Sequence, residues 1–204
     1  MAEIDGRTVG YSGNSLLADW WYWSKNIAEH QSLLKKTNDK HTSQQLRKLY
    51  RKRKRRFRHA VNTVVNSFVK SCWSEGVSEI ITGDLNGIRT NGKNMGKKSN
   101  SMVHNFWSHR YLVQRIKYKA EEYGMKVSEE DESYTSSVCP KCCSSNVIKR
   151  KRLFKCLDCT LEAHRDSVGC VNIRLAHTGG EVANWSLVSP LLLSVEVGTS
   201  HASA

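Results

Sequence analysis

Two cysteine pairs with the same internal spacing constrain this chain more than any other feature. Cys139 and Cys142 enclose two residues, Cys156 and Cys159 enclose two more, and thirteen residues separate the pairs. A two-residue gap lets both thiolates of a pair reach one ion, so the four cysteines predict a tetrahedral Zn²⁺ site. Because the protein supplies all four ligands, we expect a structural site. The alternatives are unrelated buried cysteines, a redox pair, or Cys143 as a competing ligand.

The number of cysteines indicates a reducing compartment, and the apolar segments are too short for a membrane span. Seven cysteines in 204 residues are an odd number, which does not suit a complete disulfide framework. No apolar run approaches the roughly 18 residues of a membrane span, and residues 1–13 lack the apolar core of a signal peptide. We therefore expect a cytoplasmic protein of about one domain with no membrane partner, and neither a membrane protein nor a secreted mini-protein.

Positive charge is concentrated in one segment of the chain. Lys and Arg number 32 against 19 Asp and Glu, which gives a formal charge of +13. Nine of the twelve residues from 47 to 58 are basic: Arg47, Lys48, Arg51, Lys52, Arg53, Lys54, Arg55, Arg56 and Arg58. These charges repel one another at helical spacing, so we expect phosphates to neutralise them and predict DNA as a partner. The alternatives are a solvated basic patch and a localisation signal.

Hydrophobic periodicity predicts an α/β fold with a mixed or parallel sheet. Asp19 is the expected N-cap of an early helix. A second, long helix is expected from about 43 to 73, with an apolar stripe of Phe57, Val61, Val64, Val65, Phe68 and Cys72. The other expected elements are strands at 7–11, 77–82 and 125–129, a Gly-rich loop at 86–101, and helices at 102–123 and 165–175.

Three places put carboxylates at the ends of expected elements. Asp84 follows the strand 77–82, Asp131 and Glu132 follow the strand 125–129, and Asp166 lies at the start of the last helix. Two-metal phosphodiester cleavage needs converging carboxylates that hold two Mg²⁺ ions about 3.5–4 Å apart. Asp166 and Asp84 are therefore the candidate catalytic residues, although a single such acid is more often a cap or a surface residue.

Several motifs together resemble the C-terminal half of transposon-encoded TnpB (OrfB-type) proteins. They are the long basic helix, Gly83-Asp84-Leu85-Asn86, YKAEEYG at 118–124, YTSSVCPKC at 134–142, and Arg165-Asp166 leading to VNI at 171–173. The resemblance covers roughly residues 7–176. Members of this family, many of them named transposases, are RNA-guided DNA endonucleases related to type V CRISPR effectors. The resemblance therefore implies DNA and a guide RNA as partners.

The family resemblance implies a partial RNase H-like (RuvC) domain with an inserted zinc ribbon. On this chain it divides the residues into a partial RuvC-like domain with the basic helix (1–133), the ribbon (134–162), the last RuvC-like helix (163–176) and a flexible tail with at most one strand (177–204). It also implies that the second family ligand, a Glu in many members, falls on Gly83, where Asp84 is the candidate substitute, and that the third ligand of the catalytic Mg²⁺ matches Asp166.

The resemblance implies that the first acidic ligand of the family lies on an opening strand, which we expect upstream of this chain. Asp5 looks superficially like it, but we expect Asp5 in the turn before a later strand. The opening strand is central in the RuvC fold, so without it the two halves of the sheet are expected to lose their pairing. Another polypeptide would then have to supply the missing N-terminal part.

Two functions follow from these features. The first is a TnpB-type protein that binds nucleic acid and, with Mg²⁺, cleaves DNA phosphodiesters. The second is a non-catalytic zinc-ribbon protein that binds nucleic acid, which the two absent acidic ligands favour. A third alternative is that the chain does not fold alone.

Overall fold

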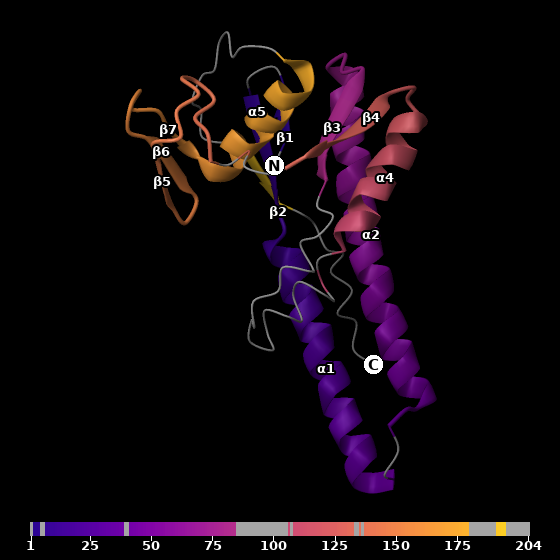
Figure 1. The fold of residues 1–204 in the computed structure, drawn as a ribbon. Coiled ribbons are helices and arrows are strands. Elements are labelled where there is room, and N and C mark those ends of the chain that lie inside the picture. The colour runs from indigo at the N-terminus through magenta and orange to yellow at the C-terminus, as the bar shows by residue number, and fades with distance from the viewer. Residues whose placement is uncertain are drawn as a thin grey trace.

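A computed structural model describes residues 2–4, 7–38, 41–84, 106, 108–132, 135, 137–179 and 191–194 (Figure 1). The helices are α1 (Asn14–Asn38), α2 (Gln44–Ser74), α4 (His109–Glu121) and α5 (Arg165–Thr178). The strands are β1 (Ala2–Ile4), β2 (Arg7–Ser12), β3 (Glu79–Asp84), β4 (Lys126–Asp131), β5 (Val147–Arg150), β6 (Leu153–Cys156), β7 (Glu162–His164) and β8 (Leu191–Ser194). This mixed α/β architecture agrees with the predicted class.

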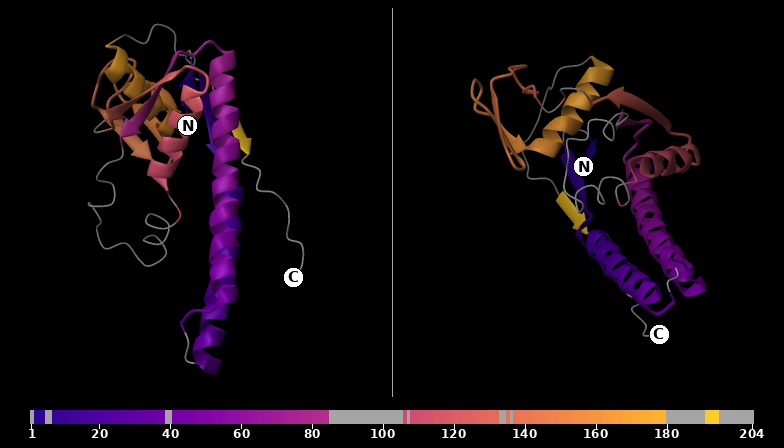
Figure 2. Two further views of the ribbon diagram at one scale, coloured as in Figure 1. Left: turned by 90° about the vertical axis from the view of Figure 1, so that its right-hand side faces the viewer. Right: turned by 60° about the horizontal axis from the view of Figure 1, so that its bottom comes forward.

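Helices α1 and α2 form a long hairpin whose far end extends beyond the strands and the other helices (Figures 1 and 2). Ser43 caps α2, because its side-chain oxygen accepts the Leu46 N–H at 3.0 Å, and the helix ends near the predicted residue. The predicted cap of α1 is wrong. The helix begins at Asn14, and Asp19 lies buried inside it, where its carboxylate binds Arg56 of α2.

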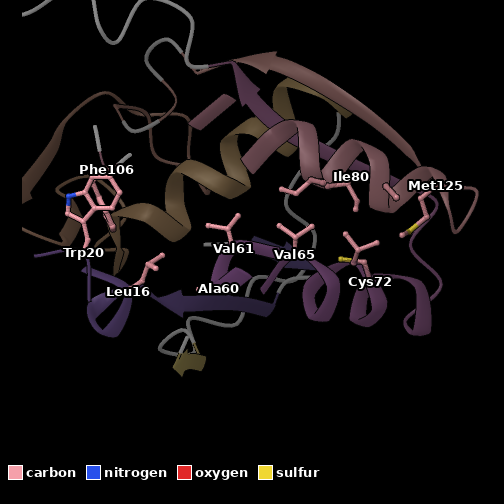
Figure 3. Close-up of a cluster of buried hydrophobic side chains, with 12 residues drawn as sticks. Leu16, Trp20, Ala60, Val61, Val65, Cys72, Ile80, Phe106 and Met125 are labelled. Atoms are coloured by element: carbon pink, nitrogen blue, oxygen red, sulfur yellow. The ribbon is translucent and has the colours of Figure 1, made fainter. Parts of the chain in front are cut away.

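The main core lies between α2 and the elements packed on it, and Figure 3 shows its buried side chains. The predicted stripe of α2 faces this core: Val61, Val65 and Cys72 are buried, and Phe57, Val64 and Phe68 pack against them. Steps of three and four place these side chains on one helical face, which buries against β3, α4 and the start of α1.

The described strands form three separate sheets. β1 pairs antiparallel with β2, β2 pairs parallel with β8, and β3 pairs parallel with β4. β1 and β3 are not hydrogen-bonded to each other, although α5 contacts both.

The third sheet, β5–β6–β7, is antiparallel and forms the ribbon beside α5 (Figure 1). The last helix extends to Thr178, three residues beyond its predicted end, and β8 is a strand in the predicted tail. The predicted loop at 86–101, residues 102–105 of the predicted helix, Asp5, and most of the tail lie outside the described residues. Among the described residues, no helix combines the length and apolar character that crossing a bilayer requires.

Helix α5 covers one face of the β3–β4 sheet, and its His177 side chain contacts acidic residues of both strands. His177 Nδ1 lies 2.5 Å from Glu130 Oε1 of β4, and its Nε2 lies 3.4 Å from Glu79 Oε1 of β3. The hydrogen bond to Glu130, and then the charge of Glu79, raise the pKa of His177 above its usual value of about 6.5. Hydrogen bonds from Ser128 and Lys126 lower the pKa of Glu79 to about 2, so this carboxylate stays charged beside the imidazole.

Substituting His177 with Gln is expected to lower the free energy of unfolding at about pH 6 but not at about pH 9. A raised folded-state pKa stabilises the fold below the unfolded-state value, and this stabilisation disappears as the pH rises through the folded-state value. Urea unfolding of both proteins across this range measures the difference. The control is the same substitution at exposed His59 of α2. A His177→Gln effect independent of pH would contradict the assignment.

Candidate metal centre and nucleic-acid surface

The four cysteines of the two knuckles converge in the ribbon. One Sγ atom from each of Cys139, Cys142, Cys156 and Cys159 lies within 4.8 Å of the others. Two Sγ–Sγ distances across the knuckles, Cys139–Cys159 and Cys142–Cys156, are 3.6 Å. Tetrahedral Zn²⁺ with Zn–S bonds of about 2.3 Å requires sulfur atoms about 3.8 Å apart. The donor set and its spacing therefore fit a zinc ion, and the cluster is compatible with a metal site.

Backbone hydrogen bonds shape both knuckles. Cys139 N–H donates to the Ser144 carbonyl at 2.8 Å, and Cys156 N–H donates to the Leu161 carbonyl at 2.9 Å. Asp158 joins the two knuckles, because it accepts hydrogen bonds from the Ser144 hydroxyl and from Asn146 Nδ2, the latter at 2.8 Å. The sulfur cluster is thus held by a network that does not depend on side-chain packing alone.

The cysteines differ in their electrostatic surroundings. Hydrogen bonding by the Cys159 backbone lowers the pKa of Cys156 to about 7, despite an opposing effect of burial. Burial raises the pKa of Cys139 to about 12. Metal binding displaces thiol protons, so a site of this kind releases protons when it fills.

Cys143 is not part of the cluster. It is exposed and lies in a turn with φ of 58°, and its thiol is absent from the group of converging sulfurs. The structure therefore does not support Cys143 as a competing ligand, and this residue provides a matched control for the other four. Of the two remaining cysteines, Cys72 is buried in the main core, as predicted, and Cys170 on α5 is partly buried.

The two candidate catalytic acids lie on opposite sides of the β3–β4 sheet. Asp84 is still within β3 and pairs with Asp131, so strand alternation puts it on the face of Ile80, which packs into the main core. The other face carries Glu79, which contacts His177 of α5, and Asp166 begins α5. β3 continues through Asp84, so the Asp84 side chain faces away from α5. This arrangement does not suit Asp84 and Asp166 as two ligands of one catalytic site.

Glu132 lies on the α5 side of this sheet edge, as does Glu130, which contacts His177. A Cβ atom on Gly83 would lie 1.8 Å from Glu132 Oε1, so the Glu132 carboxyl fills the space that a side chain at position 83 would take. Burial, and then the charges of Asp84 and Asp131, raise the pKa of Glu132. The sequence showed Glu132 at a strand end, but only the parallel register of β3 with β4 places it against Gly83.

Asp166 occupies the first turn of α5 and is partly exposed. Its backbone N–H donates to Nδ1 of the capping His164 at 3.3 Å. Burial, chiefly, raises the pKa of the neighbouring Cys170 thiol to about 11, with smaller contributions from Asp166, Glu3 and Glu132. Among the described residues, the four cysteines are the only group of three or more His, Cys, Asp or Glu side chains that could bind one metal ion.

The basic run is divided between two faces of α2, a division that the charge pattern did not predict. Three of its members turn towards α1. Arg56 makes a buried bidentate ion pair with Asp19, with Nη2 to Oδ1 at 2.7 Å and Nε to Oδ2 at 3.1 Å. Arg53 stacks on Trp20 at 4.1 Å from the ring centroid, and Lys52 lies 4.6 Å from the Trp23 centroid. These cations hold the hairpin together and are not available to a partner.

Six members of the run remain exposed on the outer side of α2. They are Arg47, Lys48, Arg51, Lys54, Arg55 and Arg58. None of the ion pairs found among the described residues involves them, and Arg58 additionally lies over the Tyr111 ring at 5.3 Å. We call these six residues the outer basic face. It is the uncompensated part of the predicted nucleic-acid surface.

Comparison with known proteins agrees with the sequence resemblance. The OrfB family model of IS605 elements, described as "Probable transposase", matches residues 1–89, and a model described as "Cas12f1-like, TNB domain" matches residues 109–173. A Methanocaldococcus jannaschii protein described as a transposase is 36% identical over 86 residues, which cover 38% of this chain and 78% of that protein. This chain belongs to the TnpB/OrfB family. The family is transposon-associated, as the resemblance implied.

Longer TnpB/OrfB relatives match only in part. A TnpB-like protein of Acidianus two-tailed virus is 32% identical over 142 residues, covering 66% of this chain and 30% of the relative. The CRISPR-associated endodeoxyribonuclease Cas12f1 of Sulfoacidibacillus thermotolerans is 35% identical over 103 residues, covering 50% of this chain and 22% of the relative. The chain thus spans less than a third of the length of these two relatives.

Solved structures show the same fold in the TnpB/OrfB-related effectors. A Cas12f1–sgRNA–target DNA complex gives a TM-score of 0.56 at 19% identity and covers 79% of this chain and 42% of that chain. A CRISPR-Cas12f ternary complex gives a TM-score of 0.57 at 21% identity, with coverage of 87% and 34%. At these identities the similarity concerns the fold alone.

Proposed function

We propose that this TnpB-type chain binds nucleic acid along the outer basic face of α2. Residues 1–133 and 163–176 are proposed as a partial RNase H-like (RuvC) domain, residues 134–162 as a zinc ribbon and 177–204 as a tail. The four cysteines would hold a structural Zn²⁺ ion that fixes the ribbon. The solved relatives in complexes with guide RNA and target DNA support DNA and RNA as the partners.

The outer basic face is the observation that carries this proposal. Its six side chains repeat along one side of a helix that contains no Asp or Glu. Like charges at this spacing repel one another unless an external anion neutralises them. A row of phosphates does so and releases its counterions, which makes binding strong at low salt and independent of base sequence.

The double substitution Arg51→Ala/Lys54→Ala is expected to weaken DNA binding and its salt dependence. Each lost phosphate contact removes about 0.9 from the slope of log K against log salt for duplex DNA, so the slope should fall by about 2. Fluorescence anisotropy with a labelled duplex at several salt concentrations measures this slope. Because both side chains are exposed, the unfolding free energy should stay within about 0.5 kcal/mol of the wild-type value.

A matched control removes two exposed lysines elsewhere, Lys70 of α2 and Lys141 of the ribbon. This control changes the net charge equally but should leave the salt slope close to that of the wild type. Equal effects of the two double variants would mean that only net charge matters. Binding that does not change between low and high salt would contradict the proposal altogether.

Divalent-metal cleavage of DNA is the second candidate function, and the position of Glu132 favours it. Glu132 lies on the side of the β3–β4 sheet that α5 covers, and Asp166 lies in the first turn of α5, so these two acids are proposed to hold Mg²⁺. Among the described residues they are not joined by a third converging carboxylate. Cleavage would therefore need a further acid from outside the described residues, such as an N-terminal part supplied by another polypeptide.

If the chain cleaves DNA with Mn²⁺ or Mg²⁺, Asp166→Ala and Glu132→Gln are each expected to abolish that cleavage. Asp84→Asn, on the opposite face of β3, is expected to leave cleavage unchanged. Gel analysis of a labelled DNA strand with each metal distinguishes these outcomes. Metal-dependent cleavage that survives Asp166→Ala would exclude this centre, and an inactive wild-type chain would leave the non-catalytic binding function as the better description.

A further inference from the structure

Helix α5 begins where the ribbon ends, with no residue between them. β7 ends at His164 and α5 starts at Arg165 (Figure 1). The Arg165 N–H donates to the Arg152 carbonyl in the β5–β6 turn at 2.7 Å, and the His164 side chain caps the helix by accepting the Asp166 N–H. Both contacts that start the helix therefore come from the ribbon or its last strand.

The second turn of α5 contributes to the core of the ribbon. Val168 is completely buried and packs in one cluster with Phe154, Leu161 and the two buried cysteines, Cys139 and Cys156. This cluster is separate from the main core between α2 and α4. The helix is thus one wall of the compartment that contains the sulfur atoms.

Asn172, one turn further along α5, holds the chain that leads into the first knuckle. Its Nδ2 donates to the Thr135 carbonyl at 2.5 Å and to the Val138 carbonyl at 2.8 Å. An amide nitrogen has two hydrogens, so both are used. Val138 directly precedes Cys139, which means that the Asn172 side chain helps to fix where the first thiol lies.

We propose that metal binding at the four cysteines orders the first two turns of α5, with Asn172 as the positioning residue that couples helix and knuckle. This rests on the proposed zinc site. The ribbon core contains only five buried residues, and ribbons this small commonly need their metal to fold. Without the ion, the cap, the Val168 contacts and the Asn172 hydrogen bonds are lost together, and Asp166 loses its fixed place.

Reciprocity makes the proposal testable from both directions. If metal orders the helix, the helix contacts form only in the metal-bound state. A substitution that weakens these contacts must then lower the affinity for the metal by the same factor by which it weakens the contacts. Residues that orient metal ligands from outside the coordination sphere typically change metal affinity about 10–100-fold when substituted. Asn172→Asp keeps the size of the side chain but removes both donors, so it tests the hydrogen bonds directly.

The first measurement is hydrogen exchange of the full chain with and without one equivalent of zinc. Amides of residues 167–172 are expected to exchange at least about tenfold faster without zinc, while those of α2 around Val69, in the main core, stay unchanged. The second measurement is zinc affinity by competition with a chromophoric chelator. Asn172→Asp should bind zinc about 10–100-fold more weakly, whereas His177→Gln, on the same helix but outside these contacts, should bind it normally.

The possible outcomes separate this proposal from the proposed zinc site. If the wild-type chain binds no zinc, both are overturned. If it binds one equivalent, but α5 exchanges equally fast with and without the ion, the zinc site stands and the coupling is overturned. The coupling is also overturned if Asn172→Asp folds and binds zinc as tightly as the wild type. Zinc-dependent protection of 167–172 supports the coupling even if Asn172→Asp fails to fold.

Discussion

Cys139→Ser is expected to abolish stoichiometric zinc binding and to unfold the ribbon while the main core stays folded. Cys139 is fully buried, its Sγ lies 3.6 Å from that of Cys159, and among the described thiols only those of Cys142, Cys156 and Cys159 share the cluster with it. Structural zinc sites contribute an apparent binding free energy of about 10–16 kcal/mol at neutral pH. A five-residue core cannot compensate for a loss of this size. Elemental analysis of the purified protein and near-ultraviolet circular dichroism measure the two effects.

The matched control for this substitution is Cys143→Ser. Cys143 lies four residues from Cys139, is exposed, and is outside the sulfur cluster. The control should retain one zinc per chain and a wild-type spectrum. Equal zinc content in the two variants would contradict the assignment of the four ligands, as would a Cys139→Ser protein whose ribbon remains fully structured.

Arg56→Ala is expected to lower the free energy of unfolding by about 3–5 kcal/mol, because it leaves the carboxylate of Asp19 buried without its counter-charge. The Asp19 side chain is 7% exposed and that of Arg56 is 12% exposed. Nε and Nη2 of the guanidinium both donate to this carboxylate, in three hydrogen bonds, so the substitution removes all of them together. Urea denaturation measures the change.

Two further variants distinguish a buried charge from a general effect of the hairpin. Asp19→Ala/Arg56→Ala removes both charges, and its loss of stability should be smaller than the sum of the two single losses. Lys25→Ala breaks the exposed pair with Glu29 on α1, and it should cost less than about 1 kcal/mol. If Arg56→Ala cost no more than Lys25→Ala, the ion pair would not be a determinant of this fold.

Local patterns in the sequence were sufficient where short spacing decides the structure. The two knuckles and the apolar stripe of α2 are set by intervals of three or four residues, and the convergence of the four thiols and the burial of the stripe are confirmed. Asp19 was misassigned because an acid near the start of a helical pattern suits both a cap and a helix interior. Only Arg56, 37 residues away, selects the interior.

The sequence did not predict the division of the basic run, and the reason differs from that for Asp19. Arg53 precedes Phe57 by four residues and Arg56 precedes the buried Ala60 by four, so both extend the apolar stripe rather than the solvent side. The charge density alone suggested a helix that is basic all round. The place of Glu132 depends on the register of two strands whose first residues are 47 apart, and no local interval encodes that register.

The continuity of α2 has a mechanical consequence. Its 31 residues form one rod of about 46 Å (Figure 2). The outer basic face lies in the N-terminal half of this rod, and the buried Val65 and Val69 lie in the C-terminal half. A rod without a hinge transmits tilt along its whole length. A polyanion that displaced the N-terminal end of α2 would therefore also tilt its packed C-terminal end against β3 and α4. A force on the outer basic face would in this way reach the sheet.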